Sequence, residues 1–246
     1  MRLTSRLVPM FVVSCLLLAP SAQGWLDEGG WIDLSGLESW NGSKEGWSVV
    51  GSVSLSPTDP KKLAAESGSG TIYNGPTGRA PNLISKESFG DVEIHLEFNV
   101  PKGSNSGIKF HSVYEVQIFD SFGSTKKSSG SDCGGVYPRS ELMPRYHAID
   151  TGYAPLANAC KPPGEWQELD LTFLAPRFDA SGKKIDCARI TAILNGKKVQ
   201  DNLEVHSGTG STWRDPEKKT GPILLQGDHG PVAFRNLKVR RLPSRS

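Results

Sequence analysis

Three polar side chains that could do chemistry lie at short intervals in the stretch YEVQIFD, residues 114–120. They are Glu115, Gln117 and Asp120. Successive side chains of a β-strand point to opposite faces, so Glu115 and Gln117 share one face and the apolar residues between them occupy the other. Carboxylates act as general bases, nucleophiles or metal ligands. We therefore predict that the apolar face joins the core and that the polar face forms a site. Asp120 has a second interpretation, in which it only starts the turn before Ser121.

A histidine in the motif QGDHG, His229, completes the predicted catalytic set of Glu115, Asp120 and His229. An imidazole changes its charge near neutral pH, which suits it to moving protons or binding a metal. The alternative is that His229 only satisfies backbone groups of its turn, and Asp228 has the same two interpretations. His95 and His111 are interpreted as structural or exposed.

The predicted substrate-binding residues carry amide, aromatic or guanidinium groups, which bind sugar hydroxyls or stack on sugar rings. They are Asn105, Gln117, Tyr137, Arg139, Trp166 and Gln226. Trp166 could instead be partial core at the start of a strand. The stretch SNSG, residues 104–107, is predicted to be a turn in which Gly107 allows a close approach of the backbone.

Alternation of apolar and polar residues positions these side chains on strands. Val92, Ile94, Leu96, Phe98 and Val100 alternate with polar residues, which is typical of a half-buried strand. The other predicted strand regions are 167–173, 189–200 with a turn at Asn195-Gly196, 222–226 and 232–242. With 27 glycines and 17 prolines and almost no helical periodicity, the chain is predicted to be all-β, an antiparallel β-sandwich of the jelly-roll type.

Two stretches do not alternate. Residues 121–165 are rich in Gly, Ser, Pro and Lys and are too long for an ordinary connection, which leaves a functional or a disordered loop. Their aromatic and chargeable residues favour an ordered loop beside the site. These residues are Tyr137, Arg139, Glu141, Arg145, Tyr146 and His147. Residues 201–220 are predicted to be a second insert.

The first 24 residues resemble an export signal. Arg2 and Arg6 precede an apolar stretch, and a small-x-small pattern ends at Gly24, so we expect a signal peptide over 1–24 and one domain over 25–246. A lipoprotein signal with a lipidated Cys15 is the alternative. Export implies a secreted or periplasmic protein.

Charge excludes some partners. Arg2 and Arg6 are two of the 28 basic residues, so the chain after residue 24 holds 26 basic and 26 acidic residues. Without a basic stripe, nucleic acid and anionic membrane surfaces are not expected partners. The apolar run near the start is too short to span a bilayer.

Three cysteines remain after residue 24, so one pair at most can form. Cys133 and Cys160 flank the long irregular stretch and could form a disulfide across it, or all three thiols could be free. A zinc site is not favoured, because the sequence has no CxxC spacing and no histidine beside Cys133, Cys160 or Cys187.

Several blocks together resemble one family. The stretches SNSGI, YEVQIFD, GGVY, PGEWQELDLTF, LNGKKV and GPILLQGDHGPVAFRNLKV are similar, in order and spacing, to the 3-keto-disaccharide hydrolase domain family. The resemblance covers about Gly30 to Leu242. It implies a concanavalin-like jelly roll related to the laminarinase-type glucanases, and an enzyme that cleaves or hydrates 3-keto-glycosides.

The same resemblance sharpens the chemistry. The laminarinase-type signature places three acids at the positions that Glu115, Gln117 and Asp120 occupy here. Retaining hydrolysis needs two carboxyl groups roughly 5 Å apart, tuned by a helper, and Gln117 cannot titrate. A 3-keto sugar requires less, because its ketone acidifies the C2 proton, so one base and one electrophile suffice. A divalent metal ion bound by Glu115, Asp120 and His229 could be that electrophile.

Two functions of different class follow. The first is an exported hydrolase or lyase that acts on 3-keto-disaccharides or 3-keto-glucosides. The second is a noncatalytic glycan-binding jelly-roll module of the cell envelope, because fold does not imply function. The sequence does not determine the oligomeric state.

Overall fold

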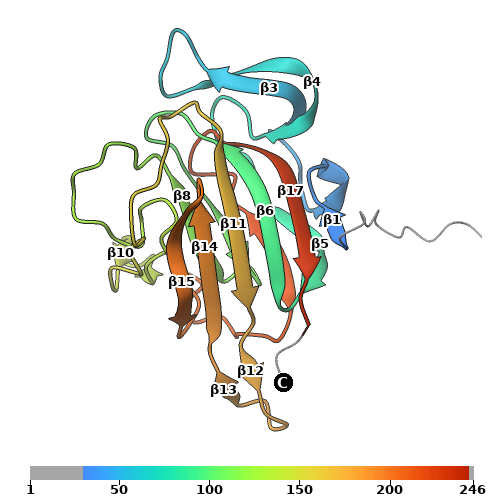
Figure 1. Cartoon of the computed structure of the whole chain (residues 1–246), viewed down its shortest axis with the longest axis vertical. Coiled ribbons are helices and arrows are strands. Elements are labelled where there is room, and N and C mark those ends of the chain that lie inside the picture. Colours follow the sequence, from blue (N-terminus) through green and yellow to red (C-terminus); the bar gives the residue numbers. More distant parts are fainter. Residues whose placement is uncertain (1–29, 244–246) are drawn as a thin grey trace, which may run out of the picture.

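The computed structural model describes residues 30–243, whose two main antiparallel sheets pack face to face (Figure 1), with two further two-stranded sheets, β9–β10 and β12–β13. The predicted signal peptide and Cys15 lie outside these residues. The antiparallel β-sandwich predicted from the alternation is confirmed. Within the described residues, no helix is long and apolar enough to cross a membrane.

The larger sheet has eight strands in the order β15-β14-β11-β6-β17-β4-β3, with β1 also paired to β17. Its strands are β1 (Trp31–Asp33), β3 (Ser48–Leu55), β4 (Leu63–Tyr73), β6 (Val92–Asn99), β11 (Gln167–Leu174), β14 (Ala188–Leu194), β15 (Lys197–Val205) and β17 (Ala233–Arg241). Asn195 and Gly196 both have positive φ and form the predicted turn between β14 and β15.

The smaller sheet has five strands in the order β2-β5-β16-β7-β8. Its strands are β2 (Trp40–Asn41), β5 (Leu83–Phe89), β7 (Asn105–Phe110), β8 (Tyr114–Phe119) and β16 (Gly221–Leu225). The remaining elements are short: η1 (Leu37–Ser39), β9 (Ser140–Glu141), β10 (His147–Ala148), β12 (Arg177–Phe178) and β13 (Lys184–Asp186).

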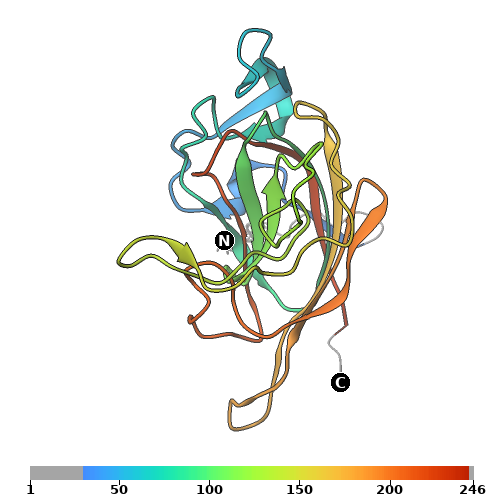
Figure 2. The same ribbon diagram turned by 90° about the vertical axis from the view of Figure 1, so that its left-hand side faces the viewer.

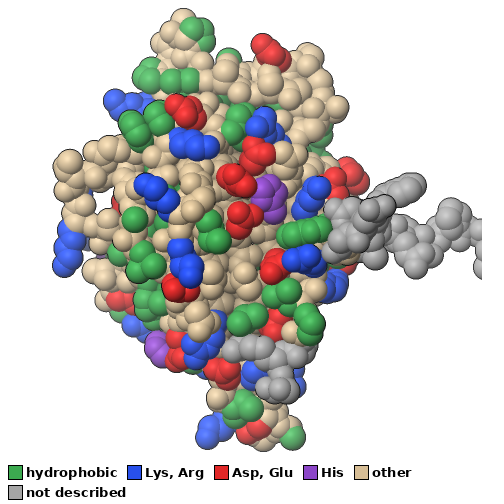
Figure 3. Space-filling model, in the orientation of Figure 1, with side chains coloured by type: hydrophobic (Ala, Val, Ile, Leu, Met, Phe, Trp, Pro, Cys, Tyr) green, Lys and Arg blue, Asp and Glu red, His purple; other side chains and the backbone are tan. Residues whose placement is uncertain are grey.

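The inward faces of the two sheets make the core. Phe110 of β7 stacks on Phe173 of β11 with ring centroids 4.4 Å apart, which joins the two sheets directly. The apolar residues of β6 are buried, whereas the alternating polar residues Glu93, His95 and Glu97 are half-buried. The outer face of the larger sheet therefore carries mixed acidic and basic side chains (Figure 3).

Two predicted boundaries are wrong. Residues 105–107 belong to β7 rather than to a turn, because they pair with β8 residue by residue. The second insert starts later than predicted, since β15 continues to Val205 through two irregularities in its register with β14. The long loop, residues 121–165, is ordered, and it runs across the strands of the smaller sheet in Figure 2.

Candidate functional site

The hairpin of β7 and β8 builds the centre of the site. Its register places Lys109 directly opposite Glu115, and the Nζ of Lys109 lies 2.9 Å from Oε2 of Glu115. Only 3% of the Glu115 side chain and 13% of the Lys109 side chain are exposed. Carboxylates and ammonium groups are buried only when they are paired, so the two charges depend on each other. Lys109 was not predicted as a site residue. A tight turn between residues 110 and 114 would have placed it opposite Glu115.

Gly107 makes room for the carboxylate. A Cβ at this position would lie 2.4 Å from Oε1 of Glu115, which is closer than real Cβ contacts allow. The predicted close approach at Gly107 is therefore confirmed, although the residue lies in a strand.

The long loop covers the edge of β8. The N–H of Tyr137 donates to the carbonyl of Glu115 at 3.0 Å, and the backbone of Gln117 exchanges hydrogen bonds with Gly134 and Gly135 at 2.9 and 2.8 Å. The N–H of Glu115 donates to the hydroxyl of Thr209 at 3.0 Å. The side chains of β8 are also buried on both faces up to Ile118, so the strand is enclosed although it carries polar residues.

A cavity of about 170 Å³, here called the Glu115 pocket, opens beside this ion pair. It is lined by Asn105, Lys109, Glu115, Tyr137, Ser140, Leu142, Tyr146, Gly210, Ser211, Gln226 and His229. Five predicted site residues meet here, from β7, β8, the long loop and the end of β16. The hydroxyls of Tyr137 and Tyr146 are 2.8 Å apart. Burial raises the pKa of Tyr137, so its hydroxyl stays protonated at neutral pH.

His229 is held by its neighbour. Its Nδ1 lies 2.6 Å from Oδ1 of Asp228, and about half of each side chain is exposed. A carboxylate at Nδ1 favours the tautomer with the proton on that nitrogen, which leaves the Nε2 lone pair free. The carbonyl of Asp228 accepts a hydrogen bond from Arg79 at 2.6 Å. His229 can therefore act as a base at the mouth of the Glu115 pocket.

Two amide oxygens are available as acceptors. The Oε1 atoms of Gln117 and Gln226 are buried and have no hydrogen-bond partner among the described residues. The Nε2 of Gln117 donates to Oδ1 of Asn105 at 3.1 Å, so Gln117 supports a residue that lines the pocket. Buried amide oxygens are normally satisfied, and of these two residues Gln226 lines the Glu115 pocket whereas Gln117 does not.

Asp120 does not line the Glu115 pocket. Its Oδ2 accepts the backbone N–H of Gly103 at 2.8 Å, and its Oδ1 accepts that of Phe122 at 3.4 Å. These contacts match the alternative of a residue that starts a turn, and they direct the carboxylate to backbone groups.

The predicted metal site is not assembled. Among residues 30–243, the groups of three potential ligands close enough for one ion contain neither Glu115, Asp120 nor His229. Oε2 of Glu115 already contacts the Lys109 ammonium, which would repel a cation. The Glu115 pocket therefore does not fit a divalent metal ion.

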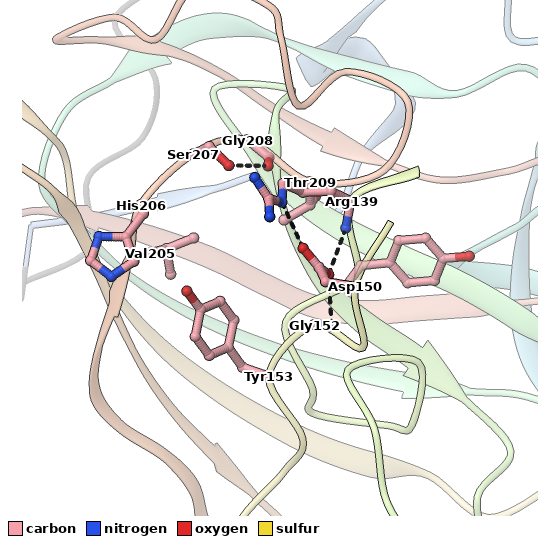
Figure 4. A pocket seen from close by; sticks show the side chains of 10 residues that line it. Arg139, Asp150, Gly152, Tyr153, Val205, His206, Ser207, Gly208 and Thr209 are labelled. Atoms are coloured by element: carbon pink, nitrogen blue, oxygen red, sulfur yellow. Dashed lines mark hydrogen bonds and ion pairs between the residues drawn. The ribbon is translucent and has the colours of Figure 1, made fainter. Parts of the chain in front are cut away.

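Arg139 lines a second, neighbouring cavity of about 290 Å³ (Figure 4). Its Nε is 2.6 Å from Oδ2 of Asp150, and its guanidinium lies 5.2 Å from the ring centre of Trp213. Partial burial raises the pKa of Asp150, but hydrogen bonds from Arg139 and from the Gly152 N–H outweigh this, so that the pKa lies below its usual value. Tyr137 lines both cavities. Arg139 was predicted to bind the substrate together with Tyr137, but it lines only the second cavity.

Trp166 lies outside both cavities. The guanidinium of Arg235 is 4.0 Å from its ring centre, and the ring packs against an apolar cluster that includes Tyr73 and Val53. Its surroundings match the alternative of a partly buried structural residue.

The three cysteines within residues 30–243, Cys133, Cys160 and Cys187, are free thiols. The Cys133 and Cys160 side chains are hydrogen-bonded to each other, which raises the pKa of the buried Cys133 and lowers that of Cys160. Of the two alternatives left by the sequence, a Cys133–Cys160 disulfide or free thiols, the structure has the second, with the two cysteines as neighbours.

Comparison with known proteins indicates what the fold and the site resemble. The model of the 3-keto-alpha-glucoside-1,2-lyase-like domain matches residues 30–240. The crystal structure of a "putative glycosyl hydrolase" from Parabacteroides distasonis is 28% identical over 70% of this chain and 72% of its own, with a TM-score of 0.54. A second such structure from this organism is 22% identical over 86% of this chain and 99% of its own, with a TM-score of 0.56. None of the curated proteins matches the chain.

Proposed function

Because the chain belongs to the 3-keto-alpha-glucoside-1,2-lyase-like domain family, we propose that it is an exported enzyme that cleaves 3-keto-glycosides by base-assisted elimination. One observation carries the proposal: the Glu115 pocket joins a base, His229, to a buried cation, Lys109. Elimination next to a ketone needs these two groups.

His229 is the proposed base. Its free Nε2 takes the C2 proton of the ketosugar, which the C3 ketone makes acidic. The electron pair of the C2–H bond forms an enolate, and the negative charge develops on O3. Because Asp228 holds Nδ1, it also stabilises the imidazolium that results.

Lys109 is the proposed electrophile. Its ammonium group lines the pocket and can bind O3 as the charge develops there. Glu115 fixes the ammonium group in place, because the two charged groups are 2.9 Å apart and almost fully buried. Glu115 is thus a positioning residue in this mechanism, and Asp120 has no part in it.

Collapse of the enolate completes the reaction. The C3 carbonyl re-forms, a C1–C2 double bond forms, and the C1–O bond to the aglycone breaks. The leaving oxygen takes the proton from the imidazolium and departs as an alcohol. Water can then add across the double bond to give the free ketosugar. The amide groups of Asn105 and Gln226 are placed to orient the sugar hydroxyls.

The test uses the purified protein with 3-ketotrehalose and a 3-keto-β-glucoside, and it measures release of the aglycone. We expect His229→Gln and Lys109→Met each to lower kcat by roughly 100-fold or more. His95→Gln is the matched control, because Nδ1 of His95 lies 2.7 Å from Asp170 on the outer face of the larger sheet. It should retain full turnover.

Isotopic labelling identifies the mechanism. Substrate that carries deuterium at C2 should react more slowly, because the C2–H bond breaks in the proposed step. Full turnover by His229→Gln, or no effect of the label together with rapid hydrolysis, would refute the elimination. Tight binding of ketosugar without turnover would instead identify a glycan-binding module.

A further inference from the structure

Three potential metal ligands lie together at one end of the β14–β15 hairpin, outside the Glu115 pocket. They are Cys187, Glu204 and His206. The register pairs Ala188 with Val205, so Cys187 and His206 are the next opposed pair beyond the two strands. Ala188 and Val205 point into the core, so their neighbours point outward on one shared face. The fold thus places His206 beside Cys187, although the two residues are 19 positions apart in the sequence.

The spacing of the ligand atoms fits a tetrahedral ion. Nδ1 of His206 lies 3.5 Å from Sγ of Cys187 and 3.5 Å from Oε1 of Glu204. Zinc bond lengths of about 2.3 Å to sulfur and about 2.0–2.1 Å to nitrogen or oxygen give ligand–ligand distances of about 3.3–3.6 Å in a tetrahedron. Both distances from Nδ1 of His206 therefore match tetrahedral zinc, and a carboxylate oxygen of Glu204 lies within 4.8 Å of Sγ of Cys187.

Neighbouring cations orient these ligands. Arg189 donates to Oε2 of Glu204 at 2.5 Å, which leaves Oε1 directed at His206. Nζ of Lys184 donates to the backbone carbonyl of His206 at 2.7 Å, and its charge is balanced by Glu217. Arg189 thus fixes the orientation of the Glu204 carboxylate, and Lys184 fixes the backbone that carries His206, before the ion arrives.

We propose that Cys187, Glu204 and His206 bind one Zn²⁺ ion. A thiolate, an imidazole and a carboxylate are a ligand set that zinc accepts, whereas Mg²⁺ and Ca²⁺ prefer oxygen atoms alone. The two negative charges of Cys187 and Glu204 balance the charge of the ion.

The fourth position of the ion faces solvent next to the cavity that contains Arg139. His206 lines this cavity on the side away from Arg139 and Asp150 (Figure 4). The His206 side chain is 70% exposed, so water or a polar group of a bound molecule can complete the tetrahedron. Three protein ligands with an open fourth position are characteristic of zinc sites that act on a ligand.

Cobalt is the probe for this site. The untagged, reduced protein is titrated with Co²⁺, which adopts the geometry of zinc and gives a thiolate-to-cobalt absorption band. We expect one equivalent to bind with this band and Zn²⁺ to displace it. Cys187→Ser should abolish the band, and His206→Ala should weaken binding by at least 10-fold.

Matched variants separate this site from others. Cys133→Ser removes another thiol, and His229→Gln removes the proposed base, so both should retain the cobalt band and the affinity. Zn²⁺ should also raise the Tm of the wild type but not that of Cys187→Ser, which detects binding without a spectrum. Cobalt bound without a thiolate band, or a band that survives in Cys187→Ser, would overturn the proposal. Circular dichroism verifies that each variant is folded.

Discussion

Strands β6 and β8 have similar sequences and opposite environments. Both alternate acidic or amide residues with apolar ones. In β6 the acids Glu93 and Glu97 lie on the outer face of the larger sheet, and each forms an ion pair with an arginine. The Glu93 side chain is 32% exposed, and the Glu97 side chain is 19% exposed. In β8 the corresponding face is covered by the long loop, and Glu115 is almost fully buried. The alternation of residues thus identifies a polar face of a strand. Whether that face forms a site depends on whether another segment, here the long loop, packs over it.

The difference matters because water screens charges. On the outer face, Glu97 accepts hydrogen bonds from Arg235 and Asn236, and its charge would be solvated without them. Inside the Glu115 pocket, the carboxylate and the Lys109 ammonium have lost most of their water and depend on each other. A buried pair of this kind also gives stronger electrostatic effects on a bound substrate.

Single substitutions of Glu115 in β8 and Glu97 in β6 test the difference between the two strands most strongly. We expect Glu115→Ala to lower the free energy of unfolding by about 3–5 kcal/mol, because Lys109 is left buried without a partner. Glu97→Ala should lower it by about 1 kcal/mol or less. Urea unfolding at pH 7 measures both values. The double variant Lys109→Met/Glu115→Leu should recover most of the lost stability, and similar losses for Glu115→Ala and Glu97→Ala would contradict the comparison.

A methyl group added at Gly107, next to the Glu115 carboxylate, tests whether the position of this buried acid matters for turnover. Gly107→Ala places its Cβ against Oε1 of Glu115 and forces the carboxylate to move away from Lys109. We expect ketosugar turnover to fall by roughly 10-fold or more, with a loss of only about 1–3 kcal/mol in stability. Gly90→Ala is the control, since its Cβ would meet only ordinary contacts at 3.5 and 3.7 Å. Equal turnover in the two variants would show that the position of Glu115 does not matter.

Acid should affect the long loop through Asp150. Its pKa is lower in the folded protein than in the unfolded chain, so its ion pair with Arg139 stabilises the fold above the unfolded value of 3.8. This stability is lost as the pH falls through the folded pKa. We expect Asp150→Asn to be less stable than wild type by at most about 1 kcal/mol at pH 7, since the pair is partly exposed. Urea unfolding near pH 2 should show a smaller difference, and a larger one there would contradict the assignment.

Much of the fold could be predicted because its cause is local. The apolar alternation in β6 and β11 and the Asn195-Gly196 turn each depend on residues close in sequence. Glu115 was predicted from the polar face of an otherwise apolar strand, and His229 from the place of its QGDHG motif in a block that resembles the family. Asp120 and Trp166 were also predicted as site residues, but they contact Gly103 and Arg235, 17 and 69 residues away in the sequence, instead of the pocket.

The sequence alone determined that the chain alternates as a sandwich and that Glu115 lies on a polar face. The tertiary structure decided which residues that face meets. Lys109 became the partner of Glu115 through a hairpin register, and the long loop supplied part of the wall of the pocket beside the pair. The two irregularities in the β14–β15 register likewise brought His206 opposite Cys187. Alternation is set by the geometry of one strand, whereas register, cover and charge pairing depend on contacts between distant segments.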